Sequence, residues 1–215
     1  MATLSLTRAH DYVLQVLDEM VSSDETPMLN GSEDFDTLKL TEGYLLEAII
    51  KAHKDAPSFL VDGVVGKEGE DYDVDWEEKV GHLKMLNNVL RVVSVKAEDS
   101  PVIVSDYSTE DSPIGRMQGN KHVRGTYDDP RLIVKKVWNT DRQPEFYYYT
   151  AKEASTTLQV EYIPYPEDIA TAFIADKLEF AILNLVASMV LDALSLHDKA
   201  VLYKNKYQEY LSVSR

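Results

Sequence analysis

The sequence predicts an α+β protein in which N- and C-terminal helices pack together and bracket an antiparallel β-meander with long loops. Apolar residues recur at helical spacing near both ends of the chain, over residues 7–57 and 174–213. Residues 89–163 between them are rich in short β-branched and aromatic runs separated by turn residues. A length of 215 residues fits one domain or two small ones and is enough to bury a proper core; we interpret residues 1–215 as a single domain.

Two helices are expected before the β part. The first covers residues 7–21, where apolar residues follow the i, i+3, i+4, i+7 spacing: Val13, Val16, Leu17 and Met20. A polar stretch from Ser22 to Lys39 reads as a long loop. Thr41 is expected to cap the second helix, which ends before Pro57.

An acidic segment follows, with eight acidic residues against Lys67 alone between Asp62 and Glu78. Its DYDVDWEE string is similar to the start of an EF-hand calcium loop. However, Trp76 stands where the turn needs glycine, and His82 stands where a bidentate glutamate belongs. We therefore favour a solvated acidic loop over a calcium site.

Five strands are expected in the β part. They cover VLRVVSV (89–95), VIV (102–104), Arg131–Trp138, Glu145–Thr150 and Thr156–Ile163. Short connections between the last three favour an antiparallel meander. Apolar and polar residues alternate in the last strand, which indicates a sheet with one face in solvent.

The loop at residues 112–131 belongs to the basic part of the chain. From Arg116 to Lys136 there are six Lys or Arg residues against two Asp residues. We expect this loop to dock on an acidic surface, either its own or that of a neighbouring copy. The alternative is a solvated loop whose charge is incidental. The candidate contact residues are Arg116, Lys121, Arg124 and Arg131.

The stretch LEFAILNLVASMVLDAL, residues 178–194, predicts a helix that is apolar around most of its circumference. Asn184, Ser188 and Asp192 form one narrow polar strip. Such a helix must be covered on several sides, by its own fold or by copies of the chain. It is too short and too interrupted by polar residues to span a membrane.

A last helix is expected from Leu196 to about Val213, with Ser195 and Asp198 spaced as a capping box. One face carries three tyrosines that we expect to pack against the preceding helix: Tyr203, Tyr207 and Tyr210. Tyrosine can bury its ring while its hydroxyl stays in contact with solvent, which suits the edge of a core or an assembly interface.

The composition excludes several classes of function. The formal net charge is -15, of which -13 falls in residues 1–80, so the protein will repel phosphate backbones rather than grip them. The absence of cysteine removes thiolate nucleophiles and zinc–thiolate sites. No His-x-x-x-His pair, Gly-x-Ser-x-Gly elbow or phosphate-binding loop is present. We therefore expect no catalytic, cofactor or metal site, and an intracellular, soluble product without a signal peptide.

Residues 89–213 resemble the head-to-tail connector (adaptor ring) proteins of short-tailed bacteriophages, those of crAss-like phages above all. The resemblance is carried by VLRVVSV, by the loop GRMQGNKHVRGT with Pro130 before Arg131, and by FYYYTAKEASTTLQVEYIPYP. It continues through AILNLVASMVLDAL and HDKAVLYKNKYQEYL.

The resemblance implies a structural virion protein that forms a homo-oligomeric ring of 12 copies in the phage neck or tail. Such a ring joins the portal protein to neighbouring tail or ring proteins and continues the DNA channel, without sequence-specific DNA binding. The protein would be made in the host bacterial cytoplasm. The alternatives are another tail-completion or tube component and, in a different class, a monomeric enzyme or regulatory protein whose site is invisible in sequence.

Overall fold

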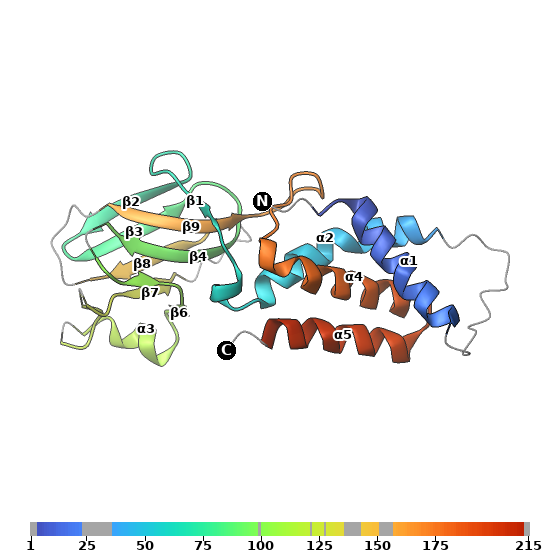
Figure 1. Ribbon diagram of the computed structural model, residues 1–215. Coiled ribbons are helices and arrows are strands. Elements are labelled where there is room, and N and C mark those ends of the chain that lie inside the picture. Colours follow the sequence, from blue (N-terminus) through green and yellow to red (C-terminus); the bar gives the residue numbers. More distant parts are fainter. Residues whose placement is uncertain are drawn as a thin grey trace. The chain divides into compact units, whose positions relative to one another are not determined.

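The α+β class predicted from the sequence is confirmed by a computed structural model of the chain (Figure 1). It describes residues 4–22, 36–98, 100–120, 122–126, 128–135, 143–150 and 157–212. The chain divides into two compact units: a helical unit, Met1–Val61 with Pro166–Arg215, and a β unit, Asp62–Tyr165. Each unit has its own core.

The helical unit is built around one central helix, α4. Its elements are α1 (Leu6–Ser22), α2 (Thr37–Asp55), η1 (Ser58–Leu60), η2 (Asp176–Leu178), α4 (Glu179–Ala193) and α5 (His197–Ser212). Helix α4 packs against α1, α2 and α5, and Figure 1 shows it between α5 and the other two. The N- and C-terminal helices therefore pack together as predicted.

The apolar surface of α4 is covered by the same chain. Ten of its residues are buried, from Ala181 through Ser188 together with Val190 and Leu191. Phe180 is the clear exception, with half of its surface exposed. The sequence left open whether the fold or neighbouring copies would cover this helix; the fold does so. The apolar length of α4 is thus no argument for assembly.

The polar strip of α4 is used for hydrogen bonds between helices. Asn184 accepts a 3.0 Å bond from the Tyr12 hydroxyl of α1 and donates to the Phe180 carbonyl. Ser188 donates from Oγ to the Ala200 carbonyl of α5 at 2.9 Å. Both side chains are buried, so each of these bonds removes the cost of an unsatisfied polar group.

A buried histidine connects α2 to the segment that precedes α4. His53 is fully buried, with Nδ1 2.8 Å from the Ile49 carbonyl. The Ala175 backbone N–H donates to Nε2 at 3.3 Å. Nε2 must therefore be the acceptor and Nδ1 the protonated nitrogen, which makes His53 neutral in this position.

Two predicted helix caps are wrong. Asp36, not Thr41, caps α2: its side chain accepts from Lys39 N, and Thr41 lies buried one turn inside the helix. Ser195 does not cap α5 but ends α4, in a left-handed conformation with φ of 61°. The backbone N–H groups of Ser195 and Leu196 donate to the carbonyls of Asp192 and Leu191, which is a Schellman C-cap.

The β unit consists of two sheets that share one core. Its elements are β1 (Val64–Val65), β2 (Tyr72–Glu77), β3 (Val80–Met85), β4 (Val89–Ala97), β5 (Ile103–Val104), β6 (Tyr107–Thr109), α3 (Pro113–Met117), β7 (Arg131–Val134), β8 (Glu145–Tyr149) and β9 (Leu158–Pro164). The strand orders are β1-β9-β4-β5 and β2-β3-β8-β7-β6. Apolar side chains from both sheets form one cluster, and the Tyr72 hydroxyl of β2 donates to the Leu158 carbonyl of β9.

The predicted acidic loop at 62–78 is wrong, because this segment holds β1 and β2. In β2, Tyr72 faces the core, whereas Asp73 and Asp75 are exposed. This alternation has the period of a strand, although the high charge of the segment conceals it. An extended strand also separates the carboxylates of the EF-hand-like string instead of wrapping them around an ion.

The predicted meander is only partly correct. Strands β7 and β8 form the expected antiparallel pair, but β9 crosses to the other sheet and pairs with β4 and β1. Strands β6 and β7 are parallel. The crossing of β9 brings its apolar side chains against those of β2 and β3 in the shared core. The end of the predicted strand Arg131–Trp138 lies outside the described residues beyond Lys135.

Candidate assembly surfaces

A short helix, α3, gives the basic loop a fixed shape. Ser112 caps it by accepting from Gly115 N at 3.0 Å while its hydroxyl donates to the Thr109 carbonyl. Gly115 lies so close to the backbone that an added Cβ would be 2.2 Å from the Thr109 carbonyl oxygen. No helix was predicted here, although Ser112 followed by Pro113 at the first helical position is a sequence signal for one.

The side chain of Gln118 holds the end of this loop. Gln118 is buried, its Nε2 donates to the Ile114 carbonyl, and its Oε1 accepts from Gly125 N at 2.8 Å. Gly125 leaves no room for a side chain, since a Cβ there would lie 2.6 Å from the Tyr149 carbonyl oxygen of β8. The loop is therefore held against its sheet at both ends: Ser112 bonds to Thr109 of β6, and Gly125 lies against Tyr149 of β8.

This fixed loop exposes large apolar side chains beside cations. Ile114, Met117 and Val123 are 44%, 48% and 48% exposed. Arg116 is exposed next to them, and Arg124 lies where its charge offsets part of the rise that burial causes in the pKa of Tyr149. We call these five residues the α3 surface. Apolar side chains grouped with arginine are typical of protein–protein contacts.

The structure separates the four basic candidates of this loop. Arg131 is neutralised by Asp129, with 2.6 Å between Nη2 and Oδ2. Within the described part of the chain, Arg116 and Arg124 have no carboxylate partner. Lys121 lies outside the described residues. Among the three described candidates, Arg116 and Arg124 are thus the ones available to another molecule.

The three tyrosine candidates of α5 differ in exposure. Tyr203 and Tyr207 are buried on the face of α5 that packs on α4. The Tyr207 hydroxyl donates to Asp55 Oδ2 at 2.9 Å, and burial raises the pKa of Tyr207 further than this carboxylate does. Tyr210 is 41% exposed, and its ring lies 6.2 Å from that of Phe180 in α4.

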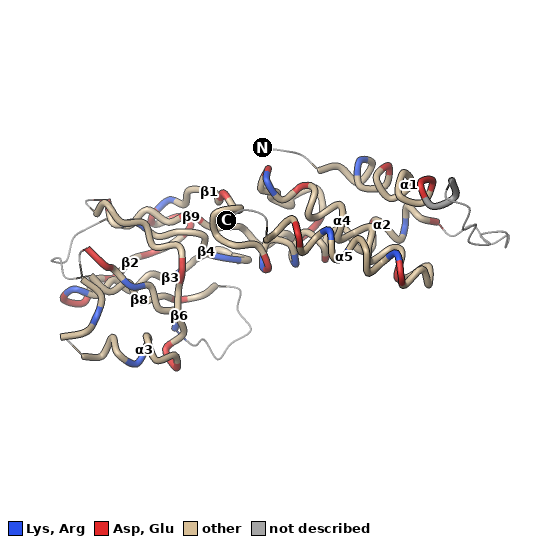
Figure 2. Tube along the Cα trace, turned by 60° about the horizontal axis from the view of Figure 1, so that its bottom comes forward, with Lys and Arg blue, Asp and Glu red and all other residues tan. Residues whose placement is uncertain are grey.

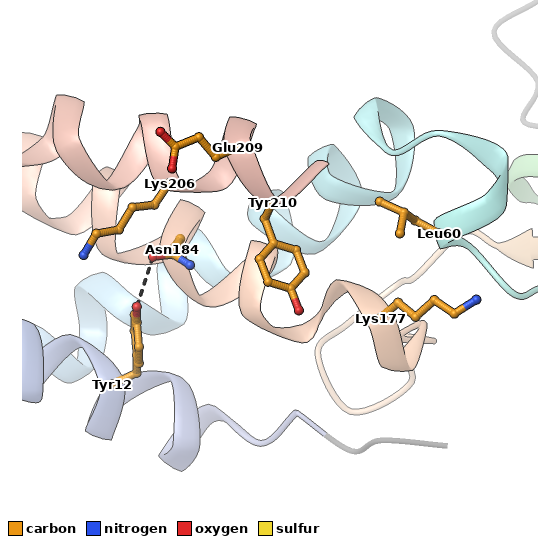
Figure 3. A pocket seen from close by; sticks show the side chains of 7 residues that line it. All are labelled: Tyr12, Leu60, Lys177, Asn184, Lys206, Glu209 and Tyr210. Atoms are coloured by element: carbon orange, nitrogen blue, oxygen red, sulfur yellow. Dashed lines mark hydrogen bonds between the residues drawn. The ribbon is translucent and has the colours of Figure 1, made fainter. Parts of the chain in front are cut away.

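Tyr210 borders a groove of about 660 Å³ in the helical unit (Figure 3). The Tyr12–Asn184 hydrogen bond lies on one side of it, and the groove also carries two lysines, Lys177 and Lys206. Burial raises the pKa of Tyr12, so its hydroxyl stays protonated and remains a donor to Asn184 at neutral pH.

Acidic and basic residues occur in both units of the chain (Figure 2). The helical unit contains 18 acidic and nine basic residues, and the β unit contains 19 and 13. In β2, Asp73, Asp75 and Glu77 share the exposed face. The cations of the α3 surface therefore belong to a chain that is acidic in both units.

No metal centre is present among the described residues, where no three His, Asp or Glu side chains are grouped to hold an ion. None of the described helices is long and apolar enough to cross a membrane.

Sequence comparison with known proteins does not assign this chain to a family. No protein-family model matches the chain, and no curated protein is similar to it in sequence.

Proposed function

We propose that this chain is a structural virion protein that forms a homo-oligomeric ring in a phage neck or tail. The ring would join the portal protein to the tail and continue the DNA channel, and its role would be mechanical rather than enzymatic. The proposal keeps the 12 copies that the connector resemblance implies. The protein would be made in the host cytoplasm and incorporated into the virion.

The α3 surface is the observation that carries this proposal. Ile114, Met117 and Val123 are exposed, as is Arg116, on a loop whose backbone is fixed by Ser112 and Gln118. A loop of this kind loses little conformational entropy when it binds. Arginine and methionine at such a surface supply contact area and charge to a partner.

The negative charge of the chain supports the proposed channel. Both units carry more acidic than basic residues, and the net charge is -15. An acidic wall does not release counterions from DNA, so it does not hold the duplex. DNA would pass through such a ring without sequence-specific binding.

The oligomeric state of the purified protein tests this proposal. We expect native mass spectrometry and negative-stain electron microscopy to show a closed ring, alone or on the portal protein encoded in the same genome. A protein that stays monomeric at every concentration and does not bind the portal would contradict the proposal. A ring found at another level of the tail would favour the tail-completion or tube alternative.

Reversing the charge of Arg124 should weaken assembly more than folding. We expect Arg124→Glu to raise the dissociation constant of the ring by about tenfold or more, because it places a like charge at an acidic partner. Its melting temperature should stay near that of the wild type. Lys79→Glu is the matched control, since Lys79 is exposed in the β2–β3 turn. If the Arg124→Glu variant forms rings of normal stability, the loop does not belong to the interface.

A further inference from the structure

The helical unit has a second hollow whose chemistry complements the α3 surface. This hollow, the Glu42 pocket, has a volume of about 410 Å³. Its walls are mainly aliphatic: Leu4, Leu6, Ile169, Ala170 and Ile174. Glu42 of α2 is the only charged residue that lines it in the described part of the chain. Glu42 is exposed and forms no ion pair with another described residue.

Two other hollows of the helical unit do not offer this combination. The groove beside Tyr210 is lined by one acid, Glu209, and by two lysines, Lys177 and Lys206, so its net positive charge would disfavour an arginine (Figure 3). A hollow beside α5 contains Asp55, but that carboxylate already pairs with Lys51 at 2.9 Å and accepts from Tyr207. Of these three hollows, the Glu42 pocket alone has a mainly aliphatic wall and an acid that has neither a lining lysine nor a described partner beside it.

The α3 surface has the matching properties. Ile114 and Met117 are one helical turn apart, so both can point into the same hollow, with Arg116 between them in sequence. Burying the aliphatic groups removes apolar area from water on both sides. An Arg–Glu pair at the rim of the contact would fix its orientation.

We propose that the α3 surface of one copy docks in the Glu42 pocket of a neighbouring copy, with Arg116 beside Glu42. This inference rests on the proposed ring and names the contact that forms it. Met117 and Ala170 are both exposed in a single chain, so both are accessible to another molecule. The two patches differ, so the contact is head-to-tail, and its repetition closes a ring if the rotation between copies permits.

A charge exchange between copies tests the contact. Arg116→Glu and Glu42→Arg should each weaken self-association on the order of a hundredfold, since each places like charges together. Mixing the two variants should restore assembly, because copies that alternate around the ring form only matched interfaces. Glu47→Arg, an exposed change on the same helix, is the control that should leave assembly unchanged.

Rescue by mixing separates contacts between copies from contacts within one chain. If assembly returns only when both changes are in the same chain, the pocket is filled by its own chain and the proposal is overturned. If each single variant assembles like the wild type, the Arg116–Glu42 contact does not exist.

Cysteine cross-linking tests the same contact without requiring stable rings, because the chain has no cysteine of its own. Met117→Cys in one copy and Ala170→Cys in another should form a disulfide-linked dimer under mild oxidation. Ile103→Cys, which replaces a 59% exposed residue of the other sheet, should cross-link to the Ala170→Cys chain at least tenfold less. Equal yields for the two pairs would overturn the proposal.

These results distinguish the inference from the proposed function. If the wild type forms rings but the Met117→Cys and Ala170→Cys chains do not cross-link, the docking contact is wrong and the ring function stands. If they cross-link but the wild type neither forms rings nor binds the portal, the contact stands and the ring function fails.

Discussion

Asp71 organises the acidic segment between β1 and β2. Its carboxylate accepts from Lys67 N at 2.9 Å, from Asn87 Nδ2 at 2.8 Å and from the Tyr162 hydroxyl at 3.0 Å. The Lys67 bond is the largest cause that holds the pKa of Asp71 below its ordinary value, followed by the Tyr162 and Asn87 bonds. The residue that the sequence offers as a calcium ligand is instead occupied by donors of its own chain.

Removing this carboxylate should destabilise the protein in a pH-dependent way. We expect Asp71→Ala to lower the free energy of unfolding by about 1–2 kcal/mol at pH 7. The pKa of Asp71 is lower in the folded state, so this stabilisation is present above the pKa of the unfolded chain, about 3.9, and is lost as the pH falls through the folded value.

Urea denaturation at pH 7 and pH 3 measures this effect. The difference between wild type and Asp71→Ala should shrink at the lower pH. Asp73→Ala, on the exposed face of β2, is the control and should stay within about 0.5 kcal/mol of the wild type. A difference that does not depend on pH would show that the Asp71 carboxylate is not what stabilises the segment.

Tyr207 provides a second test among single residues. We expect Tyr207→Phe to cost about 1 kcal/mol of unfolding free energy, because it removes the bond to Asp55 and keeps the buried ring. The pKa of Tyr207 is raised in the folded state, so the stabilisation by this hydroxyl is fully present at pH 7 and declines as the pH rises above about 10, where the tyrosine of the unfolded chain ionises. Thermal melts at pH 7 and pH 10.5 check both statements, with the more exposed Tyr210→Phe as control.

The spacing of Tyr203, Tyr207 and Tyr210 predicts a common face of α5, and the structure buries the first two on α4. Spacing alone cannot reveal that Tyr210 lies beside a groove, because this depends on where α1 leaves α4 uncovered. In the same way, six bases in residues 116–136 do not reveal which are already paired. Asp129 and Arg131 are close in sequence, so their ion pair could be anticipated. Only the fold shows that Arg116 and Arg124 have no carboxylate partner among the described residues.

Among the elements, strong apolar periodicity made α1, α4 and α5 predictable to within a few residues. Strand β2 was missed for two reasons. Its outward-facing residues are all acidic, and it has only three inward-facing apolar residues to reveal the alternation of a strand. Helix α3 was missed because five residues are too few for a helical period to appear.

The C-cap of α4 gives a test at the scale of an element. Ser195 has a positive φ, a conformation that glycine adopts without the strain of a Cβ. We expect Ser195→Gly to stabilise the protein by about 0.5–1 kcal/mol and Ser195→Ala to be less stable than Ser195→Gly by a similar amount. Differential scanning calorimetry of the three proteins checks this order. Equal stability of the glycine and alanine variants would show that the cap is not strained.

At the scale of the molecule, the β unit is inserted into the helical unit between Val61 and Pro166. Its two ends are neighbours, since Val64 of β1 pairs with Tyr162 of β9. Gly63 permits this approach, because a Cβ there would lie 3.0 Å from the Tyr162 backbone. Inserted units with adjacent ends are typical of parts that can fold alone.

Residues 62–165 should therefore fold as a separate protein. We expect this fragment to unfold cooperatively and to retain near-ultraviolet circular dichroism, because its core is formed by its own two sheets. Leu83→Ala, which removes a fully buried side chain of that core, is expected to cost about 2–5 kcal/mol and to unfold or strongly destabilise the fragment. A fragment without a cooperative transition would mean that the β unit requires the helices.

The arrangement of the five expected strands was harder to predict than their positions. The lengths of the connections favour a meander, but the crossing of β9 is decided by contacts far apart in sequence, such as Tyr72 with Leu158. The covering of α4 was likewise open, because α1 and α2, which the whole β unit separates from α4 in sequence, contribute to it together with α5.

The charges of the two units have a consequence for the conditions under which copies can meet. With net charges of -9 and -6 in its helical and β units, each copy repels the next at long range. Dissolved ions suppress this repulsion beyond about 8 Å at physiological ionic strength, while a close, partly buried contact is screened far less. Association should therefore be weakest in dilute buffer and increase as salt is added, the reverse of what a purely ionic interface would show.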